Sequence, residues 1–431
     1  MLPAVRPTGG GNFMQDNVPP VLERTEVTSD ESTPVKKGVG ARFLTLGLSL
    51  FLALLVAEVA LRILVPARTT HAIWPPGTRQ VFRPEQDIFP DLPAEAVFSA
   101  NSRGLRGPEM GVDGSEWRLL AIGGSTTECL YHDDKKMWPA RVGELLQVDG
   151  GKKVWVGNAG RSGASSGDHV LQTKYLLKEL PPVDLAVMLV GVNDVVVALG
   201  APNDYKPTPA DLPPEEHEKA IRKAFHHVPG RLEDQWDHGS FLRQSAIFQL
   251  VRRIRRQRER TLDAHNLRQE DAGTTLVRWR GYRQKASQIL TELPDLKEAL
   301  STYRKNLETT VDLAAASKVQ IVLLTQPTFW RDDLTEAEQK LLWMGGVGNF
   351  QKEPGHAYYS AGALAKAMAA FNETLLAVCK DKGLVCVDLA AEIPKTTEYF
   401  YDDCHFGQRG AEKIAAVVAS HLKGVLPFGT R

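Results

Sequence analysis

Five residues in four separated blocks of the sequence have side chains that can carry out acyl transfer. Ser125, after two glycines, offers a hydroxyl, which is a weak nucleophile without an adjacent base. His405 can take its proton, and Asp402, three residues earlier, can fix the tautomer of the imidazole. The Ser125 N–H, the Gly160 N–H and the Asn193 amide can point at a carbonyl oxygen as it becomes negative. These residues predict a nucleophile with its triad and an oxyanion hole.

Each of these residues also has an ordinary structural reading. Ser125 can cap a helix, because serine favours that position. Asn193 can be a turn residue, and His405 can be a hydrogen-bonded structural histidine. Asp403 competes with Asp402 for the imidazole, but the three-residue spacing to His405 favours Asp402. The order of the blocks favours the chemical reading over the structural one.

Short apolar runs alternate with amphipathic helices through most of the chain. The predicted strands are residues 117–122, 153–160, 183–191, 319–327 and 384–390. The predicted helices include residues 138–147, 167–178 and 410–422. This alternation predicts an α/β fold, with a parallel sheet covered by helices on both faces. Ligands of such sheets bind at the carboxyl ends of the strands, where the serine, glycine and asparagine blocks lie.

On these blocks the chain resembles the SGNH (GDSL-like) hydrolase family, named for a serine, a glycine, an asparagine and a histidine. The matching positions are Ser125 in GGST, Gly160 in NAGRSG, Asn193 in GVND and His405 in DDCHF. The resemblance covers about residues 117–425, apart from an insertion. Gly124 departs from the usual Gly-Asp-Ser, because it stands where the aspartate would be. The resemblance implies a flavodoxin-like three-layer α/β/α fold and an esterase activity.

The N-terminal residues predict a disordered tail, 1–40, followed by a transmembrane helix, 41–66. Residues 43–65 are almost wholly apolar and about long enough to cross a bilayer. A retained anchor is favoured over a cleaved signal peptide, because the preceding tail is long and no clean cleavage site follows; a core helix is the third reading. Basic residues precede the span and weakly favour a periplasmic or otherwise extracytoplasmic main domain. With the lead-in NSRGLRGPE and GGSTTE, this pattern resembles a membrane-anchored bacterial branch of the family.

The remaining organisation is a linker and lead-in segment, 67–115, and a hydrolase-like domain, 116–427. A charged helical insertion is predicted at about residues 201–300. Its stretch IFQLVRRIRRQRER reads as an amphipathic helix whose basic face is either solvated or in contact with anionic lipid. The segment 325–350 contains Trp330 and Trp343, which belong either to a lid that stacks on sugar rings or to the core.

Charge and cysteine content narrow the possible partners. Lys+Arg and Asp+Glu are equal at 52 each, which argues against nucleic-acid binding. The four cysteines form no CxxC pair and no zinc spacing, so no metal or cofactor is expected. Cys379 and Cys386 flank a helix-to-strand turn and can pair locally. If Ser125 and His405 touch, Cys129 and Cys404 lie close together, and outside the cytoplasm they can form a disulfide.

The leading interpretation is a membrane-anchored serine esterase or deacetylase. Its expected substrate is an O-acyl ester on a cell-envelope glycan or lipid, a class inferred from location. One alternative is an O-acyltransferase that passes the acyl group from the same serine to a surface polysaccharide. Another is a non-catalytic envelope assembly or binding protein. No organic cofactor or metal is required by this chemistry.

Overall fold

The chain forms two compact units, residues 1–59 and 60–431. The computed structural model describes residues 38–64, 71–111, 114–147, 151–202, 205, 214–226, 245, 247–248, 251 and 273–425. The predicted tail 1–40 therefore lies outside the described residues, except for its last three.

Helix α1 (Val39–Leu64) is apolar on every side. Its Phe43 and Leu44 side chains are 69% and 76% exposed, so no protein core covers them. Its segment Arg42–Leu61 is long and apolar enough to cross a membrane, with a mean hydropathy of 2.3. Helix α12 (Ala361–Lys382) is also long and apolar enough to cross a membrane. However, 56% of its apolar stretch is buried in the protein, as in a core helix.

A five-stranded parallel sheet forms the centre of the larger unit, in the order β4-β3-β5-β7-β9. Its strands are β3 (Glu116–Gly123), β4 (Lys153–Gly160), β5 (Leu185–Leu189), β7 (Gln320–Leu324) and β9 (Cys386–Val387). Numbered among themselves, they follow the flavodoxin-like order 2-1-3-4-5. The partners of Gly123 are Gly160 on one side and Leu189 on the other. Three strands therefore end level with one another, at the edge that carries the site.

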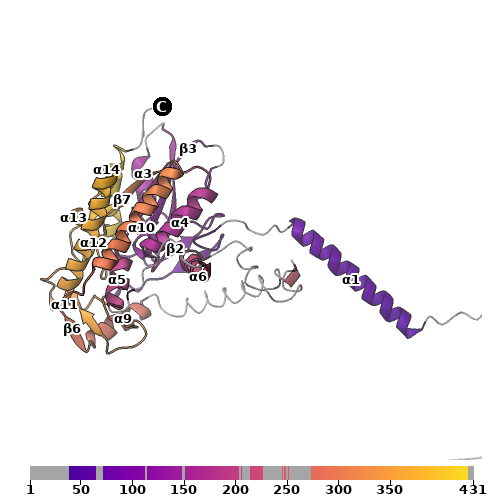
Figure 1. Ribbon diagram of the computed structural model, residues 1–431, viewed down its shortest axis with the longest axis horizontal. Coiled ribbons are helices and arrows are strands. Elements are labelled where there is room, and N and C mark those ends of the chain that lie inside the picture. The colour runs from indigo at the N-terminus through magenta and orange to yellow at the C-terminus, as the bar shows by residue number, and fades with distance from the viewer. Residues whose placement is uncertain are drawn as a thin grey trace, which may run out of the picture. The chain divides into compact units, whose positions relative to one another are not determined.

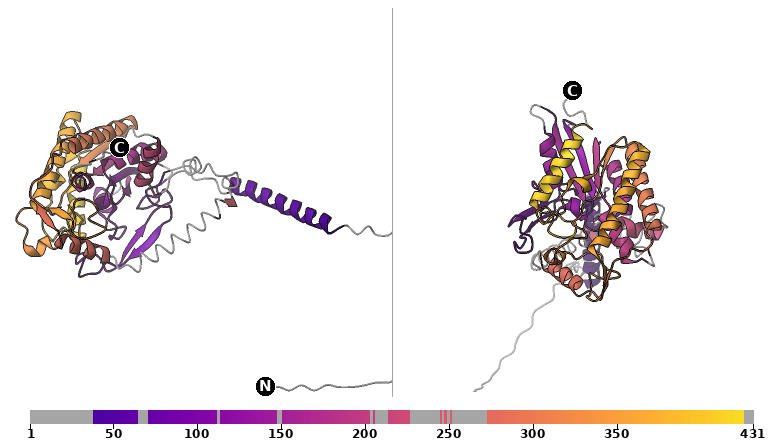
Figure 2. Two further views of the ribbon diagram at one scale, coloured as in Figure 1. Left: turned by 60° about the horizontal axis from the view of Figure 1, so that its bottom comes forward. Right: turned by 90° about the vertical axis from the view of Figure 1, so that its left-hand side faces the viewer.

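Helices cover both faces of this sheet, as the alternation predicts (Figures 1 and 2). One layer contains α3 (Trp138–Leu146) packed against α14 (Gln408–Leu422). The other contains α10 (Lys297–Ala316) packed against α4 (Ser166–Glu179) and α12. Figure 2 shows the yellow α14 and the orange helices on opposite sides of the strands. The flavodoxin-like three-layer fold is confirmed.

Short elements complete the described residues. The remaining strands are β1 (Arg79–Phe82), β2 (Ala96–Ser99), β6 (Gln288–Leu290) and β8 (Ala357–Tyr359). The remaining helices are α2 (Ser125–Glu128), α5 (Val192–Gly200), α6 (Pro214–Ala224), α9 (Thr274–Gln284), α11 (Glu336–Gln339) and α13 (Leu389–Glu392). β1 pairs with β2 antiparallel, and β6 pairs with β8 parallel.

Three predicted strands are too long. The third, predicted as 183–191, is Leu185–Leu189. The fourth ends at Leu324. The Thr325 N–H still donates to Val387 O of β9 at 3.1 Å, but the Gln326 N–H donates to Asn372 Oδ1 at 2.9 Å, outside the sheet. The fifth is only Cys386–Val387. The Asp388 carboxylate then accepts a hydrogen bond from Thr325 Oγ1 at 2.8 Å, and α13 begins.

The segment 67–115 is not a linker over its described part. It contributes β1 and β2, and it buries Phe89, Phe98 and Arg106 completely or almost completely. The insertion is also not wholly helical, since β6 lies near its end. Nearly all of its basic stretch, 247–260, lies outside the described residues.

One of the two possible cysteine pairs forms a disulfide. Cys379 at the end of α12 is bonded to Cys386 in β9, with a Cα–Cα distance of 6.2 Å. Cys129 and Cys404 are both buried and free, so the disulfide predicted between them is wrong. Cys129 is held in a left-handed conformation, φ 53°, and its Sγ donates to Thr126 O at 3.4 Å. The nearest sulfur to Cys404 among its contacts is Met344 Sδ, at 3.9 Å.

Candidate active site

Two glycines let β3 deliver Ser125 at the carboxyl edge of the sheet. A Cβ on Gly123 would lie 2.6 Å from the Leu189 carbonyl oxygen, and one on Gly124 would lie 2.5 Å from Asn193 Nδ2. The Leu189 carbonyl belongs to the sheet backbone, so Gly123 needs glycine, whereas a Cβ on Gly124 would force the Asn193 amide to shift. Ser125 follows as the first residue of the one-turn helix α2.

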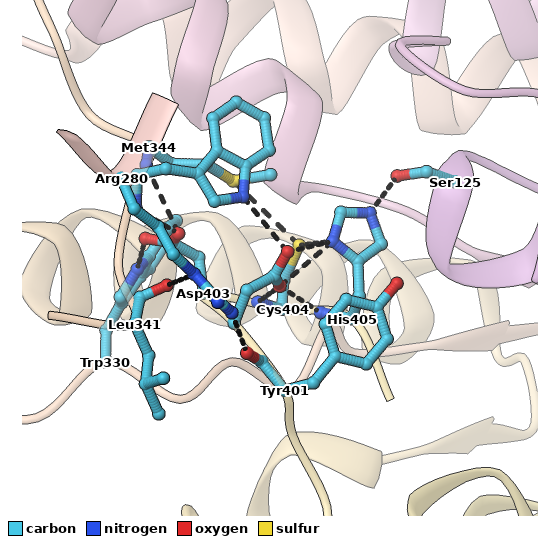
Figure 3. Close-up of polar contacts among 11 residues, drawn as sticks. Ser125, Arg280, Trp330, Leu341, Met344, Tyr401, Asp403, Cys404 and His405 are labelled. Carbon is cyan, nitrogen blue, oxygen red and sulfur yellow. Dashed lines mark hydrogen bonds and ion pairs between the residues drawn. The ribbon is translucent and has the colours of Figure 1, made fainter. Parts of the chain in front are cut away.

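The structure brings the predicted serine, histidine and aspartate into one chain of hydrogen bonds (Figure 3). Ser125 Oγ lies 2.7 Å from His405 Nε2. His405 Nδ1 lies 2.8 Å and 2.9 Å from the two carboxylate oxygens of Asp402. The Asp402 carboxylate also accepts the His405 backbone N–H at 2.8 Å. This arrangement can remove a proton from the serine and stabilise the resulting imidazolium.

The charges of the pair alter both pKa values. Burial lowers the pKa of His405, but the Asp402 carboxylate outweighs it and raises the pKa well above its ordinary value. Burial raises the pKa of Asp402, yet the His405 charge and the hydrogen bonds to the carboxylate lower it overall. Asp402 is therefore ionised at neutral pH, and it favours the protonated form of the imidazole.

Asp403 does not contact the imidazole and has a separate structural role. Its carboxylate accepts hydrogen bonds from Trp330 Nε1 at 2.8 Å and from the backbone N–H groups of Trp343 at 2.7 Å and Met344 at 3.2 Å. Burial, followed by the charge of Asp402, raises its pKa. The preference for Asp402 as the partner of His405 agrees with this geometry.

Trp330 and Trp343 belong to the core and not to a lid. Their exposed fractions are 0% and 7%. The indole N–H of Trp343 donates to Asp402 Oδ2 at 3.0 Å. Trp343 also stacks on Trp279, with ring centroids 4.5 Å apart. The aromatic residues of this segment were noted in the sequence. The hydrogen bond from the Trp343 indole to Asp402 was not predicted.

Helix α9, at the end of the insertion, supports the same loop. Arg280 donates to Tyr401 O at 2.6 Å and to Leu341 O at 3.1 Å, which links the histidine loop to the tryptophan segment (Figure 3). Trp279 lies one residue earlier on the same helix. The contacts of α9 with the histidine loop and the tryptophan segment were not predicted, because only the tertiary fold brings residues so distant in sequence together.

Asn193 lies beside Ser125, but Gly160 has a different role from the one predicted. Asn193 Nδ2 donates to Ala164 O at 2.8 Å, which leaves the second N–H of the amide. The Gly160 N–H donates to Asn158 Oδ1 at 2.7 Å, and this hydrogen bond contradicts its role as an oxyanion donor. A Cβ on Gly160 would lie 2.2 Å from the Glu128 N atom. Gly160 is therefore required for the close packing of β4 against α2.

Side chains from three segments hold the carbonyls at the end of α2. A helix of one turn leaves these carbonyls without helical partners. Trp138 Nε1 donates to Thr126 O at 3.0 Å, and Asn158 Nδ2 donates to Thr127 O at 2.6 Å. Arg106 Nη1 donates to Glu128 O at 2.6 Å and to the next carbonyl, of Cys129, at 2.7 Å.

Arg106, the charged residue among the side chains that hold α2, is almost fully buried, with an exposed fraction of 1%. Its Nη2 donates to His132 O at 2.8 Å and to Asp134 Oδ1 at 2.9 Å. Its backbone N–H and C=O exchange hydrogen bonds with Asn158 at 3.0 Å and 2.8 Å. Arg106 was not predicted as a site residue. Its signal in the sequence is its place between two glycines in the stretch NSRGLRGPE.

One set of possible metal ligands lies within the triad. Donor atoms of Asp402, Cys404 and His405 lie within 4.8 Å of one another. Burial raises the pKa of Cys404 to about 11, so this thiol is protonated at neutral pH, whereas a metal needs the thiolate. His405 Nδ1 and the Asp402 carboxylate are already bonded to each other. The chemistry of this set fits the triad hydrogen bonds better than a metal ion.

Solved structures with similar chain paths are distant in sequence. An acetylxylan esterase from Geobacillus stearothermophilus is 15% identical, with 74% of this chain and 96% of that one covered and a TM-score of 0.37. A lipase/acylhydrolase from Enterococcus faecalis is also 15% identical, with 73% and 100% covered and a TM-score of 0.35. No curated protein matches the chain.

A family model provides the decisive comparison. The model of the GDSL-like lipase/acylhydrolase family matches residues 121–413. This range includes Ser125, Asn193 and His405, which the fold brings to one edge of the sheet. The match covers more than half of the sequence, and the activity of the family is the hydrolysis of carboxylic esters. The chain belongs to the GDSL-like lipase/acylhydrolase family.

Proposed function

We propose that the chain is a membrane-anchored serine esterase in which Ser125 is the nucleophile, His405 the general base and Asp402 its orienting carboxylate. The observation that carries this proposal is the 2.7 Å contact between Ser125 Oγ and His405 Nε2. It joins the hydroxyl of a partly exposed serine to a base that a buried carboxylate holds in place.

The reaction proceeds in two halves. Ser125 Oγ attacks the ester carbonyl carbon while its proton passes to His405 Nε2. The tetrahedral intermediate then expels the alcohol, which receives that proton from Nε2 and leaves an acyl-serine. A water molecule attacks the acyl-serine in the same way, with Nε2 as base, and the carboxylic acid and free Ser125 result.

Three donors are proposed for the oxyanion: the Ser125 N–H, the second N–H of the Asn193 amide, and the Gly163 N–H in place of that of Gly160. Gly163 lies in the exposed turn after β4, next to Ala164, which Asn193 holds. Its φ is +75°, and an added Cβ would meet nothing within 4 Å. Within the described residues its N–H has no hydrogen-bond partner. These features support an N–H that is open to substrate.

Two features support an anchor and an oxidising compartment. The described apolar side chains of α1 between Phe43 and Val56 are exposed, as suits a helix surrounded by lipid. The Cys379–Cys386 disulfide is typical of proteins outside the cytoplasm. We therefore propose an O-acyl ester of an envelope glycan or lipid as substrate. Retention of the full chain in membranes after an alkaline carbonate wash, and release of a chain that starts at residue 67, tests the anchor.

The nucleophile is tested with the full-length chain in detergent, on p-nitrophenyl acetate and with a fluorophosphonate probe. Ser125→Ala should abolish both ester cleavage and labelling. Ser420→Ala is the matched control, because its hydroxyl bonds only Val417 O in α14. Labelling that survives in Ser125→Ala would exclude this serine as the nucleophile. Ser125-dependent acetyl transfer to an added glycan, in place of acetate release, would identify a transferase.

A further inference from the structure

Tyr401 covers one face of the imidazole that serves Ser125. Its ring lies nearly parallel to that of His405, at an interplanar angle of 11° and a centroid distance of 5.8 Å. Figure 3 shows the Tyr401 hydroxyl on the side of the ring that faces Ser125. A phenol hydroxyl therefore lies beside the atoms that react.

A second tyrosine belongs to the same aromatic cluster. The ring of the buried Phe89 lies 5.0 Å from that of Tyr401 and 5.1 Å from that of Tyr131. Phe82 of β1 contacts Tyr131 from another direction, at 5.4 Å. Both phenylalanines come from the segment before residue 116, outside the range that the family model matches. They fix the rings of two tyrosines that are themselves partly exposed.

The two phenol hydroxyls have no partner in the described part of the protein. The hydroxyl of the buried Tyr303 donates to Val190 O at 3.3 Å, whereas no hydrogen bond in the described residues involves the hydroxyl of Tyr131 or Tyr401. Neither oxygen is among the described buried polar atoms that lack a partner. A polar atom that is unbonded and not sealed in the core is available to solvent or to a ligand.

Tyr401 stacks on His405, and Tyr131 joins it through Phe89, so the position of the imidazole indicates which part of the ester this pair meets. His405 Nε2 must return its proton to the leaving oxygen, so the alcohol portion lies next to the imidazole. The oxyanion donors proposed above lie towards Asn193 and Gly163, beside the carbonyl oxygen. A hydroxyl at the edge of His405 is therefore placed for the alcohol and not for the carbonyl.

We propose that Tyr401 and Tyr131 form an alcohol subsite that recognises a hydroxylated ring, such as a sugar, through their two phenol hydroxyls. The inference rests on the proposed function and specifies its substrate as an acylated carbohydrate. Aromatic side chains with a fixed apolar body and a free polar tip suit sugars, which present C–H faces and hydroxyl edges. A plain alkyl alcohol would leave both hydroxyls without a partner.

The protonation state of both phenols suits this role. Burial raises the pKa of Tyr401 well above its ordinary value, and burial likewise raises that of Tyr131. Both hydroxyls are thus protonated at neutral pH, and each can donate one hydrogen bond and accept another.

The test compares two acetate esters that differ in ring hydroxyls, methyl 6-O-acetyl-glucopyranoside and cyclohexylmethyl acetate, on the full chain in detergent. The wild-type kcat/KM should favour the sugar ester. Tyr401→Phe and Tyr131→Phe remove only the hydroxyls, and each should lower kcat/KM for the sugar ester about 3- to 10-fold. The same variants should change cyclohexylmethyl acetate less than 2-fold. Tyr175→Phe is the matched control, because its ring packs on His71 and Phe225 of another cluster.

Each alternative outcome contradicts a defined part of the argument. Equal wild-type rates on the two esters, or equal losses on both in the tyrosine variants, would overturn the subsite. Cleavage of p-nitrophenyl acetate with no cleavage of either ring ester would also overturn it. In all of these cases, Ser125-dependent cleavage of p-nitrophenyl acetate would leave the proposed esterase intact. Tyrosine effects that follow the length of the acyl chain would place the pair on the acyl side instead.

Discussion

The indole N–H of Trp343 donates to Asp402 Oδ2 at 3.0 Å, while Asp402 accepts from His405 at the same carboxylate. Through this bond, Trp343 affects the negative charge on Asp402 that His405 experiences, although Trp343 reaches neither Ser125 nor the substrate position. Trp330, in the same segment, makes the equivalent bond to Asp403 at 2.8 Å. Two adjacent buried carboxylates each have their own tryptophan, and only one of these carboxylates faces the imidazole.

Trp343→Phe should move the acid limb of the kcat/KM profile to higher pH. The indole N–H disperses part of the negative charge of Asp402, so its loss leaves a stronger field at His405 and raises the imidazole pKa further. Catalysis needs neutral His405, and activity is lost as the pH falls through that pKa. A hydrogen bond to a charged group corresponds to a shift of up to about one unit. The measurement is kcat/KM between pH 5 and 9.

Two variants separate this effect from general damage. Trp330→Phe removes the same chemical group from Asp403 and should leave the acid limb in place, even where the free energy of unfolding falls. Asp402→Asn removes the charge itself, so the limb should move to lower pH, with a loss in kcat on the order of 10⁴-fold. An unmoved limb in Trp343→Phe would show that the indole only packs.

Gly124→Ala should lower kcat about 10²-fold with little change in KM. The added Cβ would lie 2.5 Å from Asn193 Nδ2, so the amide must move away from the position beside Ser125. Loss of one oxyanion donor has an effect of this size, because it acts only in the transition state. Steady-state kinetics on p-nitrophenyl acetate give both constants.

Gly281→Ala is the matched substitution for Gly124→Ala. Gly281 lies inside α9, and an added Cβ there meets nothing within 4 Å. It should stabilise the chain by roughly 0.5–1 kcal/mol, because alanine favours helix over glycine, and leave kcat unchanged. Full activity in Gly124→Ala would show that Asn193 is not an oxyanion donor.

The parts of the site that follow strand ends were predictable from the sequence. Apolar runs in alternation with helices imply a parallel sheet, and a parallel sheet gathers the residues after its strands. Ser125 and Asn193 were therefore placed correctly without coordinates. The three-residue spacing of Asp402 and His405 is local, so a tight turn is enough to join them.

The parts that depend on atomic direction were not predictable. Gly160 lies at the expected strand end, but its N–H points to Asn158 Oδ1. Proximity of Ser125 and His405 implied proximity of Cys129 and Cys404, yet it did not fix the direction of either thiol. Arg106 comes from a segment that looked like a linker, because the hydrogen bonds of its side chain all go to residues at least 22 positions away.

Arg106→Lys should lower kcat about 10²-fold without abolishing folding. Lysine retains a positive charge near Asp134, but it lacks the planar fork that reaches the Glu128, Cys129 and His132 carbonyls together. The turn that carries Ser125 is then free to shift, and a displacement of about 1 Å has an effect of this order. The rate of fluorophosphonate labelling should fall in parallel with kcat.

Arg118→Lys is the control for loss of a buried arginine. Arg118 is also buried, and it bonds the Gly111 carbonyl at 2.6 Å and the Pro182 carbonyl at 3.3 Å, near the start of β3. Its substitution should lower the free energy of unfolding and leave kcat unchanged. Equal kinetic effects in the two arginine variants would assign Arg106 a purely structural role.

Reduction of the chain should break one disulfide and leave the site unchanged. The Cys379–Cys386 bond closes a short loop, with a sequence separation of 7, and its loss should lower the free energy of unfolding by about 2 kcal/mol. The double variant Cys379→Ala/Cys386→Ala should show the same loss and no further response to reductant. Denaturant unfolding measures both effects, and kcat should stay constant, since neither cysteine contacts the triad. Peptide mapping after alkylation of the unfolded, unreduced chain should find Cys129 and Cys404 as free thiols. A crosslink between these two would contradict the structure at the histidine loop.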